Sequence, residues 1–158
     1  VFIDGMHLFE FALRDFMNAE RFASYESLVI VDDIFPCHPA QAARLPRTDS
    51  WTGDVWKLQL ILRELRPDLK LISLNAKGTG LLLIAGLDPA NRVLWENYDQ
   101  IVRRYGQDID PPSEILKRIG TSPSDSVLVT RLLILLNGAR QKNWSHIQVR
   151  EALWQLSA

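Results

Sequence analysis

The sequence predicts an α/β protein whose parallel sheet ends in one reversed strand and is followed by helices. Two short apolar segments, 1–3 and 27–31, flank an amphipathic segment, as in a β-α-β unit. Two further apolar segments, 69–74 and 80–85, are too close together in the chain for any pairing except a hairpin. After them, apolar residues recur at helical spacing. We therefore divide the chain into an α/β part, 1–89, and a C-terminal helical extension, 90–158.

Composition indicates a single globular domain. The chain has 158 residues, of which 47% are hydrophobic and 23% charged, and its formal net charge is −1. Near-neutral charge gives no sign of a nucleic-acid or membrane partner. The longest apolar run, 127–136, is too short to span a membrane, and it predicts a buried helix. Cys37 is the single cysteine, which fits a reducing, cytoplasmic location.

The first half of the chain alternates strands and helices. Segment 6–23 carries a wide apolar stripe at helical spacing and precedes the strand at 27–31. Segment 35–53 is rich in proline and has few periodic apolar positions, so we expect a long, functional loop. Thr52 or Asp54 could cap the next helix, 54–65, which Pro67 ends.

A hairpin and four helices complete the chain. The apolar segments 69–74 and 80–85 are separated by five residues, which cannot support a parallel crossover, so we expect antiparallel pairing. In the helical extension, the spacing of apolar residues predicts four helices, at 90–105, 112–119, 123–140 and 145–156.

Acidic residues end both early strands. Asp4 follows the first strand, and the pair Asp32 and Asp33 follows the second. Ligands of open α/β sheets bind at this carboxyl edge, and carboxylates there suit a hard divalent cation such as Mg²⁺. Each acid taken alone could instead belong to a turn or a helix cap. The two together, at neighbouring strand ends, predict a metal site formed by Asp4, Asp32 and Asp33.

Histidine and tryptophan residues complete the candidate site. His7 lies three residues after Asp4, and the pKa of an unperturbed imidazole suits a general base, although His7 could also cap or pack at a helix start. Trp51, in the long loop, and Trp56, in the helix predicted after it, flank Gly53. Trp51 is the better candidate for a lid over a bound aromatic or sugar molecule. Trp56 shares a helical face with Leu60 and fits the core.

The sequences Val-Phe-Ile-Asp-Gly-Met-His (1–7) and Leu-Val-Ile-Val-Asp-Asp (28–33) resemble strands four and five of class I S-adenosylmethionine-dependent methyltransferases, in the small-molecule O-methyltransferase branch. That fold is a Rossmann-like sheet of seven strands whose last hairpin inserts a reversed strand. Residues 1–88 would match strands four to seven. The glycine-rich first loop and the acid ending strand two, which hold the cofactor in that family, do not occur in the 158 residues, so we expect that sequence precedes Val1.

The resemblance implies an enzyme that methylates a hydroxyl of a small-molecule acceptor, with S-adenosylmethionine as cofactor and Mg²⁺ or another divalent cation. It implies cofactor contacts at Asp4, Gly5 and His7, with His7 as catalytic base. The sequence Trp-Thr-Gly-Asp-Val-Trp-Lys (51–57) matches the substrate-contacting loop, which implies substrate contacts at Trp51, Asp54 and Trp56. The helical tail is a candidate contact for a homodimer.

Two other functions also fit parts of the chain. A metal-dependent ribonuclease of the NYN/PIN type has a first strand similar to Phe-Ile-Asp-Gly, although His7 stands where that family has Asn. The neutral charge and the tight hairpin fit this alternative poorly. A non-catalytic methyltransferase-like scaffold, whose helical tail docks a partner, is the third interpretation.

Overall fold

The computed structural model describes residues 1–156, which form a mixed α/β fold with four strands, six α-helices and one short 3-10 helix. The elements are, in chain order, β1 (Phe2–Ile3), α1 (Phe9–Arg21), β2 (Val29–Val31), η1 (Pro39–Ala42), α2 (Lys57–Leu65), β3 (Lys70–Leu74), β4 (Leu81–Ala85), α3 (Val93–Tyr105), α4 (Ser113–Leu116), α5 (Val127–Gln141) and α6 (His146–Trp154). All predicted strands and helices are present. Only η1, inside the expected loop, is new.

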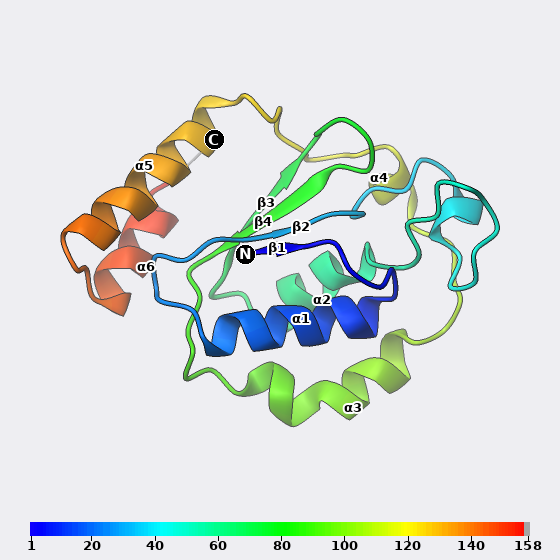
Figure 1. The fold of residues 1–158 in the computed structure, drawn as a ribbon, viewed down its shortest axis with the longest axis horizontal. Helices are drawn as coiled ribbons and strands as arrows, with labels where there is room; N and C mark the ends of the chain where they lie inside the picture. The colour runs from blue at the N-terminus through cyan, green and yellow to red at the C-terminus, as the bar shows by residue number, and fades with distance from the viewer. Residues whose placement is uncertain (157–158) are drawn as a thin grey trace.

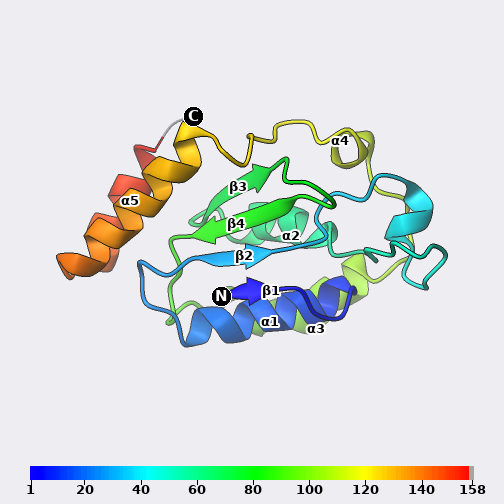
Figure 2. The same cartoon turned by 45° about the horizontal axis from the view of Figure 1, so that its top comes forward.

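The four strands form one mixed sheet in the order β1-β2-β4-β3. β1 and β2 are parallel, and β4 is antiparallel to both of its neighbours, so the predicted hairpin of β3 and β4 is confirmed. The arrows of β1, β2 and β3 point to the same side in Figure 2, and the arrow of β4 points the other way. β1 lies at the edge of the sheet.

Three helices cover one face of the sheet. α1, α2 and α3 lie below the sheet in Figure 1 and share one hydrophobic core with alternate strand residues, including Val31, Leu82 and Ile84. Side chains of a strand alternate between its two faces, so Leu83 and Ala85 belong to the second core. The alternation within β4 therefore divides the molecule into two cores.

The hairpin of α5 and α6 packs on the opposite face. Leu132, Leu136 and Val149 from these helices pack with Leu83 and Ala85 of β4. Segment 127–136 is helical as predicted but is not a buried helix, because Leu133 and Ile134 face solvent on the side away from the sheet. No helix within residues 1–156 is long and apolar enough to cross a membrane.

Chain segments from three parts of the sequence gather at the edge where β1, β2 and β3 end. The β1–α1 connection and the long loop after β2 lie there, together with the β3–β4 turn. The backbone N–H of Phe35 donates to the carbonyl of Thr79, which joins the loop to the turn. This edge therefore holds every acid that the sequence predicts for the site.

Candidate metal centre at the carboxyl edge of the sheet

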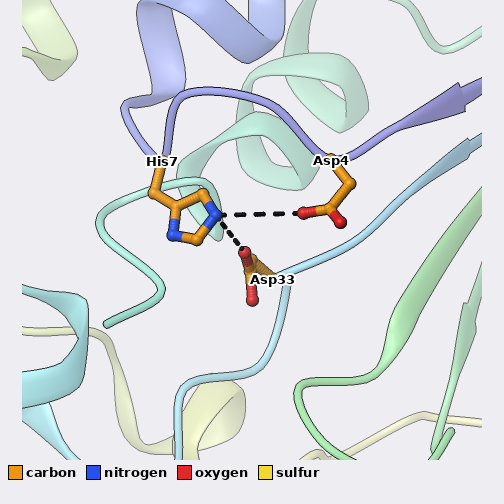
Figure 3. Close-up of side chains that lie close together, drawn as sticks. All are labelled: Asp4, His7 and Asp33. Atoms are coloured by element: carbon orange, nitrogen blue, oxygen red, sulfur yellow. Dashed lines mark ion pairs between the residues drawn. The ribbon is translucent and has the colours of Figure 1, made fainter. Parts of the chain in front are cut away.

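Three side chains converge at the ends of β1 and β2. Asp4 follows β1, His7 precedes α1 and Asp33 follows β2, and one ligand atom from each lies within 4.8 Å of the others. His7 Nε2 is 3.0 Å from Asp33 Oδ2 and 3.8 Å from Asp4 Oδ1. Dashed lines mark these two contacts in Figure 3. We call Asp4, His7 and Asp33 the cation cluster. Asp4 is half-exposed, whereas Asp33 is buried, so the cluster opens to solvent beside Asp4.

The orientation of the His7 ring is fixed from its other nitrogen. His7 Nδ1 lies 2.7 Å from the backbone carbonyl oxygen of Trp51. A carbonyl oxygen only accepts hydrogen bonds, so Nδ1 carries the proton and Nε2 faces the two carboxylates. A neutral ring would then direct the Nε2 lone pair at the carboxylate of Asp33. That arrangement needs a proton or a metal cation between the two atoms.

The backbone around Asp33 turns its side chain toward His7. Asp33 has φ 61°, in the left-handed region that aspartate tolerates better than most residues. Asp32 Oδ1 accepts hydrogen bonds from the Asp33 backbone N–H at 2.8 Å and from Thr79 Oγ1 at 2.9 Å. The predicted ligand Asp32 therefore supports the turn, and His7 occupies the third position of the cluster instead.

The cluster disfavours an ionised Asp33. Burial raises the pKa of the Asp33 carboxyl above its usual value, and the nearby charges of Asp32 and Asp4 act in the same direction. The charge of His7 opposes this shift without cancelling it. A bound divalent cation would supply the positive charge that the buried carboxylate lacks.

The predicted substrate contacts separate into two groups. Trp51 lies at the site, with its ring centroid 5.2 Å from that of His7 and its Nε1 donating to the carbonyl of Ala43. Asp54 and Trp56 are each 1% exposed, so neither reaches a ligand in this conformation. Asp54 Oδ2 accepts hydrogen bonds from Arg44 and Lys57, which leaves its carboxylate engaged inside the protein.

A groove lies along β1, the edge strand of the sheet, and Asp4 is the one member of the cation cluster that lines it. Its volume is about 600 Å³, and Asp4 and Gly5 line it together with Asp15 and Asn18 of α1. Apolar residues, including Phe2, also line it. Two of the three predicted cofactor contacts, Asp4 and Gly5, border this groove, whereas His7 lies outside the residues that line it.

Several residues that shape the site give no signal in the sequence. Besides Lys57, the partners of Asp54 lie 10 residues away at Arg44 and 45 residues away at Phe9, whose backbone N–H donates to Asp54 Oδ1. The Asp54 carboxylate thus accepts a backbone N–H at the start of α1, whereas no side chain caps the start of α2, where Thr52 or Asp54 is expected to do so. Among local signals, only Gly53 marks this segment as one with a special backbone conformation.

Comparison of the chain with family models, with curated proteins and with solved structures found no match.

Proposed function

We propose that this chain belongs to a methyltransferase that transfers the methyl group of S-adenosylmethionine to a hydroxyl of a small molecule, assisted by a divalent cation in the cation cluster. The observation that carries the proposal is the His7 ring, whose Nδ1 proton is committed to Trp51 while Nε2 faces Asp33 at 3.0 Å. Metal-binding histidines commonly donate their second N–H to a backbone carbonyl in this way.

The sheet supports the family resemblance. Its order is β1-β2-β4-β3, and only β4 is reversed, as the resemblance implies for strands four to seven with an inserted last strand. The two strands that end in acid are neighbours and parallel, so Asp4 and Asp33 meet at one edge. We infer a Rossmann-like arrangement from this order, in which the acids lie at the ligand-binding edge.

The donor set fits a divalent cation. Two carboxylates and one imidazole suit Mn²⁺ and similar ions, and carboxylates also suit Mg²⁺. When bound, such an ion lowers the pKa of a coordinated hydroxyl and holds the hydroxyl in place for attack on a methyl group. Asp33 and His7 would hold the ion from the buried side. Asp4, with a side chain that is 49% exposed, would face the entering acceptor.

His7 could act as a cation ligand or as a general base, but not as both at the same time. Nε2 has a single lone pair, which can hold a cation or accept a proton from the acceptor. The two neighbouring carboxylates would stabilise the imidazolium in the second case, as expected for a general base. We favour the ligand role because Asp33 and Asp4 both lie close to Nε2. Without a cation, His7 is the catalytic base.

The cofactor site is proposed at the carboxyl end of β1, beside Asp4 and Gly5. The resemblance implies that the glycine-rich cofactor loop precedes the strand that matches β1, and the free edge of β1 is the side on which such a sheet would continue. The groove of about 600 Å³ beside this edge begins at Asp4 and Gly5. A strand that continued the sheet would fill the part of the groove along β1, so the cofactor would lie at its end beside Asp4 and Gly5, close to the cation cluster.

Equilibrium dialysis with radiolabelled S-adenosylmethionine, with and without Mn²⁺, tests the proposal on a polypeptide that joins this chain to the glycine-rich cofactor loop of that family. We expect saturable binding of S-adenosylmethionine that is weaker in Asp4→Asn. Asp49→Asn, in the exposed loop, is the matched control and should bind like the wild type. Intact Mn²⁺ binding without any S-adenosylmethionine binding would contradict the methyltransferase function. Cleavage of single-stranded RNA in the presence of Mg²⁺ would instead support the ribonuclease alternative, since a carboxylate-held cation also serves that chemistry.

A further inference from the structure

We propose that the segment 51–54, Trp-Thr-Gly-Asp, is a positioning device for His7, and that Gly53 is a positioning residue that no other amino acid can replace. Trp51 and Asp54 come from the loop after β2 and form hydrogen bonds to His7 through backbone atoms, and Gly53 lies between them against the His7 carbonyl. The inference rests on the proposed function for the role of His7, but the contacts that carry it do not depend on a bound cation.

Two hydrogen bonds join the segment to the same residue. The carbonyl oxygen of Trp51 lies 2.7 Å from His7 Nδ1, and the backbone N–H of Asp54 donates to the His7 carbonyl oxygen at 3.2 Å. One contact fixes the ring, and the other fixes the main chain from which the ring projects. Because both come from backbone atoms, no single side-chain substitution at position 51 or 54 removes them directly.

Gly53 allows this close approach. Its φ is +56°, and a Cβ added there would lie 1.6 Å from the carbonyl oxygen of His7 and 2.7 Å from its carbonyl carbon. No real Cβ contact is that short, and the atoms it would meet are backbone atoms that cannot rotate away. Any side chain at position 53 must therefore push the 51–54 segment and His7 apart.

The segment is anchored on its far side. The backbone N–H groups of Thr52 and Gly53 both donate to the carbonyl of Gln41, at 3.0 and 3.1 Å, and Thr52 Oγ1 donates to the same oxygen. Trp51 Nε1 donates to the carbonyl of Ala43. The segment thus lies between η1 and His7, and a change in its position is transmitted directly to the ring.

Asp54 connects the device to the helical extension. Its carboxylate accepts hydrogen bonds from the Phe9 backbone N–H, from Arg44 and from Lys57. Lys57 Nζ also donates to the carbonyls of Tyr105 and Gln107, at the end of α3. The 51–54 segment is therefore held between residues from four parts of the chain, and His7 is positioned by a rigid support.

The test compares Gly53→Ala with Gly120→Ala in the full chain. Gly120 also has a left-handed backbone, with φ +75°, but a Cβ added there would meet nothing within 4 Å. Both variants carry the same kind of backbone strain, so only Gly53→Ala should disturb His7. We expect Gly53→Ala to change the ¹⁵N chemical shifts of the His7 imidazole and to weaken Mn²⁺ binding by about tenfold or more. Gly120→Ala should match the wild type in both.

The two measurements separate the two proposals. If the wild type binds no Mn²⁺, the cation part of the proposed function fails, while the His7 chemical shifts still test the positioning device. Wild-type shifts in a folded Gly53→Ala variant would overturn the device. If Gly53→Ala does not fold, Thr52→Val is measured instead, because it removes one anchoring hydrogen bond and keeps Gly53. We then expect smaller changes in the same direction, and unchanged His7 shifts would overturn the inference.

Discussion

Two groups of charged side chains each include a residue near the start of α1, His7 in one and Glu10 in the other, and differ in how their charges are balanced. In the ion-pair network, the carboxylates of Glu10 and Asp54 face the cations of Arg44 and Lys57. In the cation cluster, two carboxylates face only the imidazole of His7. The network satisfies its own charges, whereas the cluster needs a charge from outside. This difference separates a structural group from a candidate functional one.

The largest effect is expected from breaking the balanced group. Asp54→Ala would leave Arg44 and the buried Lys57 without their shared carboxylate, and it would also remove the acceptor of the Phe9 backbone N–H. Loss of one partner from a buried ion pair costs about 3–5 kcal/mol of stability. Urea unfolding should show this loss. An unchanged free energy of unfolding would contradict the structural role of the network.

Asp33→Asn should affect binding and stability in opposite directions. It removes a ligand, and supporting residues alone are typically worth about 10–100-fold in metal affinity, so we expect a loss of about 100-fold for Mn²⁺. It also removes a carboxylate whose charge burial disfavours, so the free energy of unfolding without metal should rise near neutral pH. Calorimetric titration and urea unfolding check the two effects. A fall in both quantities would mean that Asp33 is a structural residue.

Asp32 distinguishes the ligand set predicted from the sequence from the one found in the structure. An asparagine at position 32 keeps an oxygen that can accept from the Asp33 N–H and from Thr79. We therefore expect Asp32→Asn to weaken Mn²⁺ binding by less than about threefold and Asp32→Ala to weaken it by about tenfold. A loss in Asp32→Asn as large as that in Asp33→Asn would make Asp32 a ligand.

The smallest expected effect is a difference between the two groups in how the free energy of unfolding depends on pH. Burial raises the pKa of Glu10, but the hydrogen bonds and charge of Arg44 outweigh it, so the pKa of Glu10 is lowered from its ordinary 4.5. Its contribution to stability is present above pH 4.5 and is lost as the pH falls through the lowered value. Asp33, whose pKa is raised, destabilises the fold above its folded pKa and stops doing so below its unfolded value of 3.8.

Urea unfolding across this pH range checks the two signs. Glu10→Gln should flatten the loss of stability in acid, because it removes a group that takes up a proton on unfolding below pH 4.5. Asp33→Asn should gain stability over the wild type only at the higher pH values. The same pH profile in both variants would contradict the distinction between the two groups.

The elements of the fold could be predicted because each has a local signal. The apolar stripe of α1 and the short loop between β3 and β4 determine those elements from neighbouring residues alone. The exposed face of α5 could not be predicted, since eight of the ten residues in 127–136 are apolar and only Thr130 and Arg131 are polar. Which stripe becomes buried depends on the sheet that the helix meets.

The candidate site could be predicted only in part. Asp4 and Asp33 follow from their positions at strand ends, but choosing between Asp32 and Asp33 requires the positive φ of Asp33. His7 is predicted from the sequence as a base, and its place beside both carboxylates needs the structure. The buried position of Asp54 depends on Arg44, in a loop whose path no periodicity determines. The contact of Trp51 with His7 spans 44 residues and uses a backbone carbonyl, which has no signature in side-chain chemistry.

Mn²⁺ titration of the full chain near neutral pH, followed by the electron paramagnetic resonance of the free ion, tests the central claim most directly. The cation cluster predicts saturable binding of a single ion, which is lost in Asp33→Asn and in His7→Ala and kept in the control Asp49→Asn. Binding that none of these substitutions changes would place the ion elsewhere. No binding at all would contradict a metal centre at Asp4, His7 and Asp33.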